Sequence, residues 1–176
     1  MDILLFDDGQ KIESALVENA VGTDSLLVPN DYWNRLNAQE RKSLRGKLPF
    51  LLRKYSKQIA SMKRLYYKAG KIKYNRGVGK MKKFSIRVHT GVWSTLGVLA
   101  AAHGVSRCYL FNYMLWLEEI SGKEDFFVKT WNLGVPSFHW TYKMTWKIDR
   151  RQNLISRELK LEPNPMTNRY PYYLTS

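Results

Sequence analysis

The stretch KKFSIRV at residues 82–88 decides the fold that the sequence predicts. Within it, apolar and polar side chains alternate with the period of two that is typical of a strand with one buried face. One face of this strand is therefore apolar, and the other is rich in hydrogen-bond donors. We expect Phe84, Ile86 and Val88 to face a core, and Lys83, Ser85 and Arg87 to face outward.

Two helices are expected directly after this strand. Thr90 can cap the first helix, and Gly104 is suited to end it. Ser106 can cap the second, residues 107–119, which is apolar on nearly every side. Such a helix has to be buried all round, and one strand and one helix cannot bury it, so a second copy of the motif is needed. The expected core residues on the two helices are Trp93, Leu96, Leu110 and Met114.

The earlier part of the chain contains a candidate for this second copy. At an offset of sixty residues Ser25, Val28, Trp33 and Leu36 match Ser85, Val88, Trp93 and Leu96, and at fifty-nine Leu51 matches Leu110. We interpret residues 23–62 as a diverged first copy, with Asn30 or Asp31 capping a short helix and a longer helix beginning near Pro49. The alternative is a homodimer of the second copy, residues 82–120. In the intramolecular arrangement, an antiparallel partner of the strand at residues 85–88 is formed by Ser25, Leu26, Leu27 and Val28.

The remaining segments complete an expected α+β fold. Residues 1–22 form an N-terminal segment without an assigned role, and residues 63–81 form a basic linker. This linker is a flexible connector, an arm that follows phosphates, or both at once. Residues 121–176 are expected to contain a β-hairpin around the polar turn at residues 149–153, followed by an irregular tail from Pro163.

The charge distribution points to a polyanionic partner. The formal net charge is +14, and between Glu40 and Glu118 the chain has eighteen Lys and Arg residues without one Asp or Glu. Cations set against phosphates release condensed counterions, which favours binding to nucleic acid. An anionic membrane surface is disfavoured, because no expected helix combines a clean apolar face with a lysine-rich one.

The second copy also carries a family resemblance. The strand at residues 82–88, the helix through Trp93, Leu96 and Leu99, and the turn at residues 104–107 resemble the ribbon-helix-helix family of bacterial regulators and antitoxins over residues 82–119. The resemblance implies that two strands pair into a ribbon that enters the major groove of double-stranded DNA. It assigns base reading to Lys83, Ser85 and Arg87, and phosphate binding to the backbone N–H groups of Ser106 and Arg107. Other phosphate contacts are expected from Lys71, Lys73, Arg76, Lys80 and Lys82.

The whole chain further resembles an uncharacterised spirochaete family of unknown function.

The sequence therefore predicts a DNA-binding transcriptional regulator. Arginine and lysine can donate to guanine O6 and N7, and a serine hydroxyl can serve several bases. Leu27 occupies the outward position that matches Arg87, which makes the ribbon asymmetric. We expect such a ribbon to read one non-palindromic half-site rather than an inverted repeat.

Two alternatives stay open at this point. The protein is an RNA or single-strand binder if Tyr66, Tyr67, Tyr74 and the terminal tyrosines stack on bases. It is antitoxin-like if residues 121–176 bind a protein partner. Catalysis is disfavoured, since His103 and Arg107 flank one turn without a second arginine-histidine cluster or paired carboxylates.

No cofactor or metal is expected, because Cys108 and the histidines lack metal-ligand spacing. A cytoplasmic protein is expected, because the longest apolar runs are too short to cross a bilayer.

Overall fold

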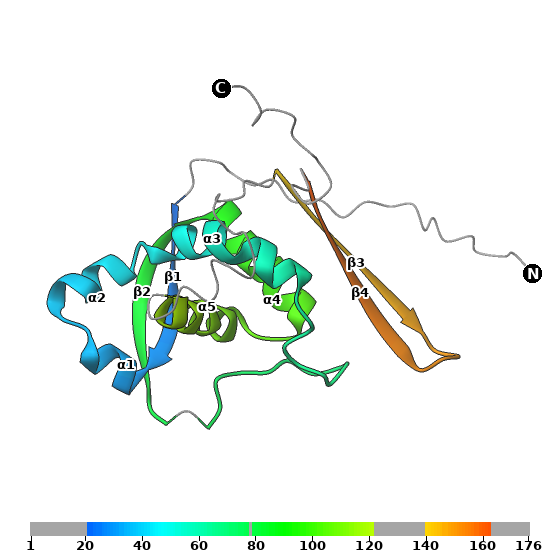
Figure 1. Ribbon diagram of the computed structural model, residues 1–176, viewed down its shortest axis with the longest axis horizontal. Helices are drawn as coiled ribbons and strands as arrows, with labels where there is room; N and C mark the ends of the chain where they lie inside the picture. Colours follow the sequence, from blue (N-terminus) through cyan, green and yellow to red (C-terminus); the bar gives the residue numbers. More distant parts are fainter. Residues whose placement is uncertain (1–20, 78, 122–139, 163–176) are drawn as a thin grey trace, which may run out of the picture.

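The computed structural model describes residues 21–77, 79–121 and 140–162, which form an α+β fold as the sequence predicts. Figure 1 shows α3, α4 and α5 together beside the ribbon of β1 and β2, with the hairpin of β3 and β4 beyond α4. The expectations for residues 1–20, 122–139 and 163–176 lie outside the described residues. The elements are β1 (Val21–Pro29), α1 (Asn30–Arg35), α2 (Ala38–Leu44), α3 (Lys47–Ser61), β2 (Met81–His89), α4 (Thr90–His103), α5 (Arg107–Ser121), β3 (Thr141–Asp149) and β4 (Leu154–Glu162).

Strands β1 and β2 pair antiparallel with each other as expected, but residues 25–28 lie opposite residues 82–85 and not opposite 85–88, so the expected register is corrected. The register places Ser25 opposite Ser85, and the pairing extends well beyond the expected residues, from Val21↔His89 to Pro29↔Met81. Alternation along both strands sends one set of side chains into the core, because successive residues of a strand point to opposite faces. The buried set comprises Leu26, Val28, Phe84, Ile86 and Val88.

The two halves of this core are related by a constant offset. The bounds of β1 and β2 differ by sixty residues at both ends, and so do the bounds of α3 and α5. Leu51 in α3 therefore corresponds to Phe111 in α5, both fully buried, and the expected match of Leu51 with Leu110 is wrong by one residue. Helices α1 and α4 also begin sixty residues apart.

The first half differs from the second at the position equivalent to α4. The second half has the single helix α4 there, whereas the first half has the two short helices α1 and α2. Helix α2 was not expected from the sequence. Asn37 and Glu40 form a capping box, in which Asn37 Oδ1 accepts from the Glu40 N–H at 2.8 Å and Glu40 Oε2 accepts from the Asn37 N–H at 2.7 Å. This local pair satisfies backbone groups at the start of α2 and stabilises the break.

The expected helix caps are partly corrected. Because the ribbon pairing continues to Pro29 and His89, these residues are the N-caps of α1 and α4, and Asn30 and Thr90 are the first helical residues. Gly104 ends α4 as expected, with a φ of 65° that suits glycine.

Two other helix starts follow the sequence more closely. The Tyr109 N–H donates to Ser106 Oγ at 3.1 Å, so Ser106 caps α5 as expected. Helix α3 begins at Lys47, two residues before the expected start, and Pro49 lies in its first turn, where proline is tolerated.

Helix α5 supplies much of the core but is not buried on every side. Leu110, Phe111 and Met114 are fully buried, whereas the Trp116 side chain is 50% exposed. The expectation of burial all round is therefore wrong, because within the described residues α3, α4 and β1 pack against only part of its surface. Trp93 is partly buried against the core, and Leu96 is fully buried.

The C-terminal hairpin is confirmed. Strands β3 and β4 pair antiparallel from Thr141↔Glu162 to Asp149↔Leu154. Asp149 Oδ1 accepts from the N–H groups of Arg151 and Gln152 at 3.0 and 2.9 Å, which holds the turn together.

The basic linker is pinned to the turn between α4 and α5. The Lys73 N–H donates to the Gly104 carbonyl at 2.9 Å, and the Ser106 N–H donates to the Lys73 carbonyl at 2.9 Å. The Tyr66 N–H donates to the His103 carbonyl at 3.2 Å. Residues 66–73 are thus bound to the body of the protein and do not form a free connector.

Candidate nucleic-acid interface

The outward face of the ribbon brings the expected base-reading residues together. Lys83, Ser85 and Arg87 are all exposed on β2. Opposite them on β1 lie Leu27, Ser25 and Thr23 respectively. Asp24 is the one acidic residue of β1 and β2, and alternation places it on the other face.

Sequence reasoning missed Thr23 as a member of this face, because the expected strand began at Ser25. Thr23 lies opposite Arg87 and is exposed. The signal was present in the repeat, since Thr23 precedes Lys83 by the same sixty residues that separate Ser25 from Ser85.

Leu27 breaks the symmetry of the face. It corresponds to Arg87 in the repeat, lies opposite Lys83, and has a side chain that is 37% exposed. Its carbonyl accepts from Asn112 Nδ2 at 2.7 Å, which ties β1 to α5. Because this hydrogen bond uses the backbone carbonyl of Leu27, a substitution of the Leu27 side chain leaves the hydrogen bond to Asn112 in place.

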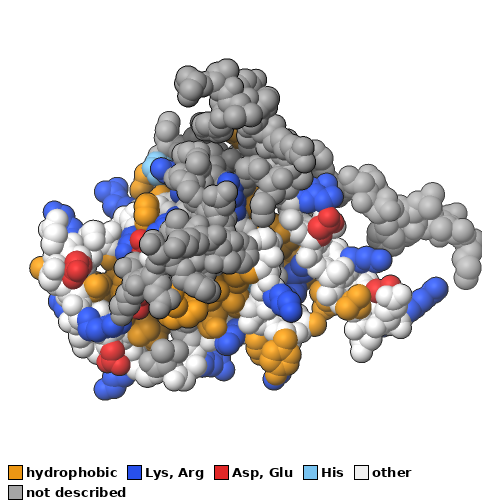
Figure 2. Space-filling view, viewed as in Figure 1, with side chains coloured by type: hydrophobic (Ala, Val, Ile, Leu, Met, Phe, Trp, Pro, Cys, Tyr) orange, Lys and Arg blue, Asp and Glu red, His pale blue; other side chains and the backbone are white. Residues whose placement is uncertain are grey.

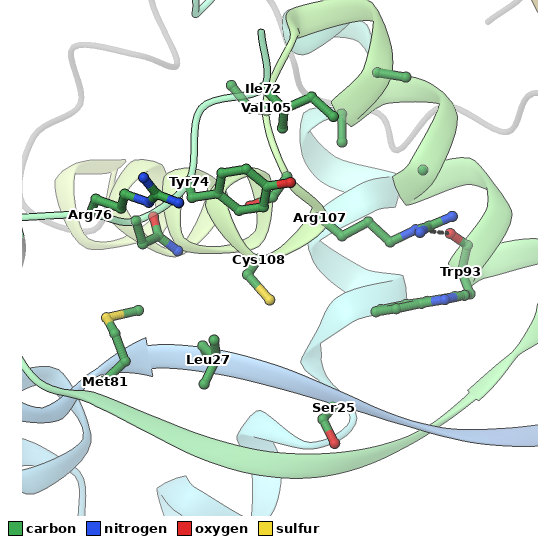
Figure 3. A pocket seen from close by; sticks show the side chains of 15 residues that line it. Ser25, Leu27, Ile72, Tyr74, Arg76, Met81, Trp93, Val105, Arg107 and Cys108 are labelled. Atoms are coloured by element: carbon green, nitrogen blue, oxygen red, sulfur yellow. Dashed lines mark hydrogen bonds between the residues drawn. The ribbon is translucent and has the colours of Figure 1, made fainter.

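A hollow of about 660 Å³ lies beside the ribbon, bounded by the linker and the α4–α5 turn. Figure 3 shows Leu27 and Met81 on the ribbon side, with Tyr74, Arg76 and Arg107 from the linker and the turn across from them. Cys108 also lines the hollow, and burial raises the pKa of its thiol. Its thiol is therefore protonated at neutral pH.

Arg107 is held on α4 at the edge of this hollow. Its Nε donates to the Trp93 carbonyl at 3.4 Å, and its guanidinium lies 5.0 Å from the centroid of the Trp93 ring (Figure 3). A Cβ at Gly97 would collide with this guanidinium, so the absence of a side chain there makes the packing feasible. The charged guanidinium of Arg107 therefore lies against α4 and does not extend away from the turn between α4 and α5.

One expected phosphate contact is wrong. The Ser106 N–H donates to the Lys73 carbonyl, so it is not available to a phosphate. The physical reason is that the backbone of the linker pairs with the turn between α4 and α5. The Ser106 N–H therefore already has an acceptor in the linker, which no pattern in the sequence indicates. The role expected for the Arg107 N–H stays a prediction.

The expected phosphate-binding side chains lie on the surface of the linker and at the start of β2. Lys73 Nζ lies 5.1 Å from the Tyr109 ring centroid, and the Arg76 guanidinium lies 5.8 Å from that of Tyr74. Figure 2 shows Lys and Arg side chains spread over the described surface, with Asp and Glu scattered among them. The exposed residues of the expected set are Lys71, Lys73, Arg76, Lys80 and Lys82.

His103 is a buried structural residue. The Leu65 N–H donates to His103 Nδ1 at 3.3 Å, so Nε2 carries the proton and donates to the Ile59 carbonyl at 2.7 Å. Burial lowers the pKa of His103, and the nearby charge of Arg64 acts in the same direction. The ring is neutral and enclosed, which leaves it unsuited to act on a bound phosphate together with Arg107.

No group of three His, Cys, Asp or Glu side chains that could hold a metal ion occurs in residues 21–77, 79–121 and 140–162. Across the same part of the chain, each helix is too short or too polar to cross a bilayer.

These features define an α+β protein whose two-stranded antiparallel ribbon presents a polar, basic outward face. The model of the family described as "Protein of unknown function (DUF1564)" matches residues 1–168, and the chain belongs to this family. Comparisons with curated proteins and with solved structures gave no match. The family match gives no support to the ribbon-helix-helix resemblance, which rests on the residues and the strand pairing alone.

Proposed function

We propose that this protein is a DNA-binding transcriptional regulator that reads the major groove of double-stranded DNA with the β1–β2 ribbon. The observation that carries the proposal is the exposed row of Lys83, Ser85 and Arg87 on one face of a two-stranded ribbon. A two-stranded ribbon fits the major groove, and these side chains supply donors that match base edges there.

In this proposal the chain contains two ribbon-helix-helix copies that form a pseudo-dimer. The constant offset of sixty residues between β1 and β2, and between α3 and α5, supports the duplication. The pairing of Ser25 with Ser85 supports it independently, because equivalent residues face each other only at the centre of a two-fold ribbon. A single chain then makes the whole ribbon, and no second chain is required.

The pseudo-dimer reads DNA unequally with its two strands. Lys83 and Arg87 on β2 present cations, whereas the equivalent positions on β1 are Thr23 and Leu27. Base reading is therefore concentrated on β2, and the preferred site is a single non-palindromic half-site. The linker lysines and Arg76 supply contacts to phosphates that carry no sequence information.

Two substitutions separate base reading from phosphate binding. Arg87→Ala is expected to abolish the preference for the specific site over random duplex, because it removes the main donor to guanine. Lys71→Ala is expected to weaken binding to both duplexes equally, and to reduce the slope of log K against log salt by ~0.9. Fluorescence anisotropy with specific and random duplexes, the specific one selected from a random pool, measures both effects.

The proposal fails if Arg87→Ala and Lys71→Ala lower the affinities for specific and random duplexes by the same factors. In that case the ribbon contributes charge alone. Far-UV circular dichroism of both variants controls for folding, and both side chains are exposed, so no loss of structure is expected.

A second candidate function, binding of RNA or single strands, is favoured by exposed tyrosines on the linker. The Tyr67 side chain is 82% exposed and Tyr74 51% exposed, and both lie among basic residues. Aromatic side chains in such surroundings can stack on unpaired bases. Competition by single-stranded DNA or RNA against duplex decides, since a ribbon reader is displaced more effectively by duplex.

An antitoxin-like protein partner at the C-terminal region is a third candidate. Ile148 and Leu154 are 64% and 54% exposed near the end of the hairpin. In this role Ile148→Ser with Leu154→Ser leaves duplex affinity unchanged and removes binding to the partner.

A further inference from the structure

A second, smaller hollow of about 170 Å³ lies between the end of α4, the start of the linker and β4. Arg64 from the linker and Arg157 from β4 both line it, together with the buried His103. The two arginines are far apart in the sequence, and only the packing of the hairpin against α4 brings them to one place.

Among the described residues, both guanidinium groups have buried donors without a hydrogen-bond partner. Arg64 Nη1 donates to the Lys68 carbonyl at 3.2 Å, while its Nε and Nη2 have no partner. Arg157 Nη2 donates to the Ala69 carbonyl at 3.2 Å, while its Nε has no partner. Buried donors are nearly always satisfied in folded proteins, so these unpaired groups call for an acceptor.

The two guanidinium groups are fixed by their packing. Arg64 lies against Gly104, where any Cβ would collide with its guanidinium. The guanidinium carbon of Arg157 lies over the Trp146 ring, 3.9 Å from the ring centroid. Side chains held in this way lose little further conformational freedom when they bind a ligand.

The hollow carries positive charge without a compensating carboxylate. Among the described residues that line it, none is Asp or Glu, and His103 is neutral. Burial lowers the pKa of Arg157, and the charge of Arg64 adds to the effect. An anion between the two arginines would relieve their repulsion and accept from the unpaired donors. A tetrahedral phosphate group suits this purpose, because guanidinium forks match its oxygens.

We propose that Arg64 and Arg157 form a binding site for a phosphate group that links the linker to the C-terminal hairpin. The phosphate comes either from free inorganic phosphate or from a nucleic-acid backbone, and the chemistry of recognition is the same in both. This site is distinct from the outward face of the ribbon.

Thermal unfolding of the full chain in inorganic phosphate, against chloride at equal ionic strength, tests the site. The wild-type midpoint is expected to rise with phosphate concentration, because a ligand that binds only the folded state stabilises it. Arg64→Gln and Arg157→Gln are expected to lose most of this rise, and Arg150→Gln, exposed at the hairpin turn, to keep it. Equal rises in all four proteins would overturn the proposal.

Arg157→Lys keeps the test decisive if Arg157→Gln does not fold. It retains the charge and loses the planar fork, so a smaller phosphate-dependent rise than in wild type is expected. A rise as large as that of wild type would overturn the role of the guanidinium.

Duplex binding identifies the source of the phosphate. If a DNA backbone supplies it, Arg157→Gln reduces the slope of log K against log salt by ~0.9, and inorganic phosphate competes with duplex. If free phosphate is the ligand, Arg157→Gln binds duplex as wild type does while losing the phosphate-dependent stabilisation. The thermal experiment uses no DNA, so its result stands whether or not the ribbon reads a groove.

Discussion

Ser25 and Ser85 lie directly opposite each other at the midpoints of β1 and β2. They are also equivalent residues of the internal repeat, because the bounds of both strands and of α3 and α5 differ by the same sixty residues. A residue that faces its own equivalent marks the axis of a two-fold arrangement. In the proposed pseudo-dimer these two residues lie on the two-fold axis, and this relationship leads to the first prediction.

A disulfide is expected to form between the two central positions. In a Cys108→Ser background, which removes the single native cysteine, Ser25→Cys with Ser85→Cys places two thiols on one face of paired strands. Opposite residues of antiparallel strands have Cα atoms within the range that disulfides span. Non-reducing electrophoresis should show a monomer of increased mobility.

The matched control replaces Asp24 instead of Ser25, because residue 24 points to the other face of the ribbon. Asp24→Cys with Ser85→Cys should stay reduced under the same oxidation. A covalent dimer from the Ser25 and Ser85 pair would show that the ribbon forms between chains. Sedimentation of the unmodified protein at micromolar concentration should give a 20.7 kDa monomer that still binds duplex.

Leu27→Arg is expected to make the outward face of the ribbon more symmetric. It introduces on β1 the residue that the repeat has at Arg87, at a side chain that is already 37% exposed. A new bidentate contact to guanine should add about 1–3 kcal/mol of discrimination at one further base pair. Selection of duplexes from a random pool should then recover sites closer to an inverted repeat.

Leu154→Arg is the control for added charge, since it places the same residue on the hairpin away from the ribbon. It should raise affinity for all duplexes without changing the selected site. If both variants select the same sequences as wild type, Leu27 does not face bases.

The stability of the protein is expected to fall as the pH drops below about 6.5, because of His103. Burial holds its pKa below 6.5 in the folded state, so the unfolded chain binds a proton first as the pH falls. The free energy of unfolding therefore decreases as the pH drops through 6.5 towards the folded-state pKa.

His103→Phe should flatten this dependence in urea titrations, although it lowers stability at every pH by leaving the Ile59 carbonyl and Leu65 N–H unpaired.

Gly104→Ala is expected to destabilise the protein by more than about 1 kcal/mol. Its φ of 65° disfavours a side chain, and a Cβ there would collide with the Arg64 guanidinium. Gly91→Ala is the matched control in the same helix, because nothing lies within 4 Å of a Cβ at that position. The control should leave stability unchanged or raise it by up to about 1 kcal/mol. Equal effects in chemical denaturation would contradict the role assigned to Gly104.

Much of the fold could be predicted because its signals are local. The alternation in residues 84–88 predicts both the buried and the exposed side chains of β2, since a strand sends successive residues to opposite faces. Gly104 and Ser106 predict the end of α4 and the start of α5, because helix termini need particular backbone angles and side-chain acceptors. The repeat of Ser25 at Ser85 predicts which strand would pair with β2.

The candidate site was predictable only in part. The exposure of Lys83, Ser85 and Arg87 follows from periodicity, but the loss of the Ser106 N–H to the Lys73 carbonyl does not. That bond joins two segments whose approach depends on the path of the whole linker. A pattern within either segment carries no information about it.

By itself, the sequence determined the alternating strand, the helix ends, the internal repeat and the accumulation of positive charge, because each depends on neighbouring residues or on composition. The tertiary structure decided which side of α5 leaves Trp116 exposed, how Arg107 lies against Trp93, and how Arg64 and Arg157 reach one hollow. These outcomes depend on how separate elements pack. Packing is set by the shapes of side chains that are distant in the sequence, so no local pattern encodes it.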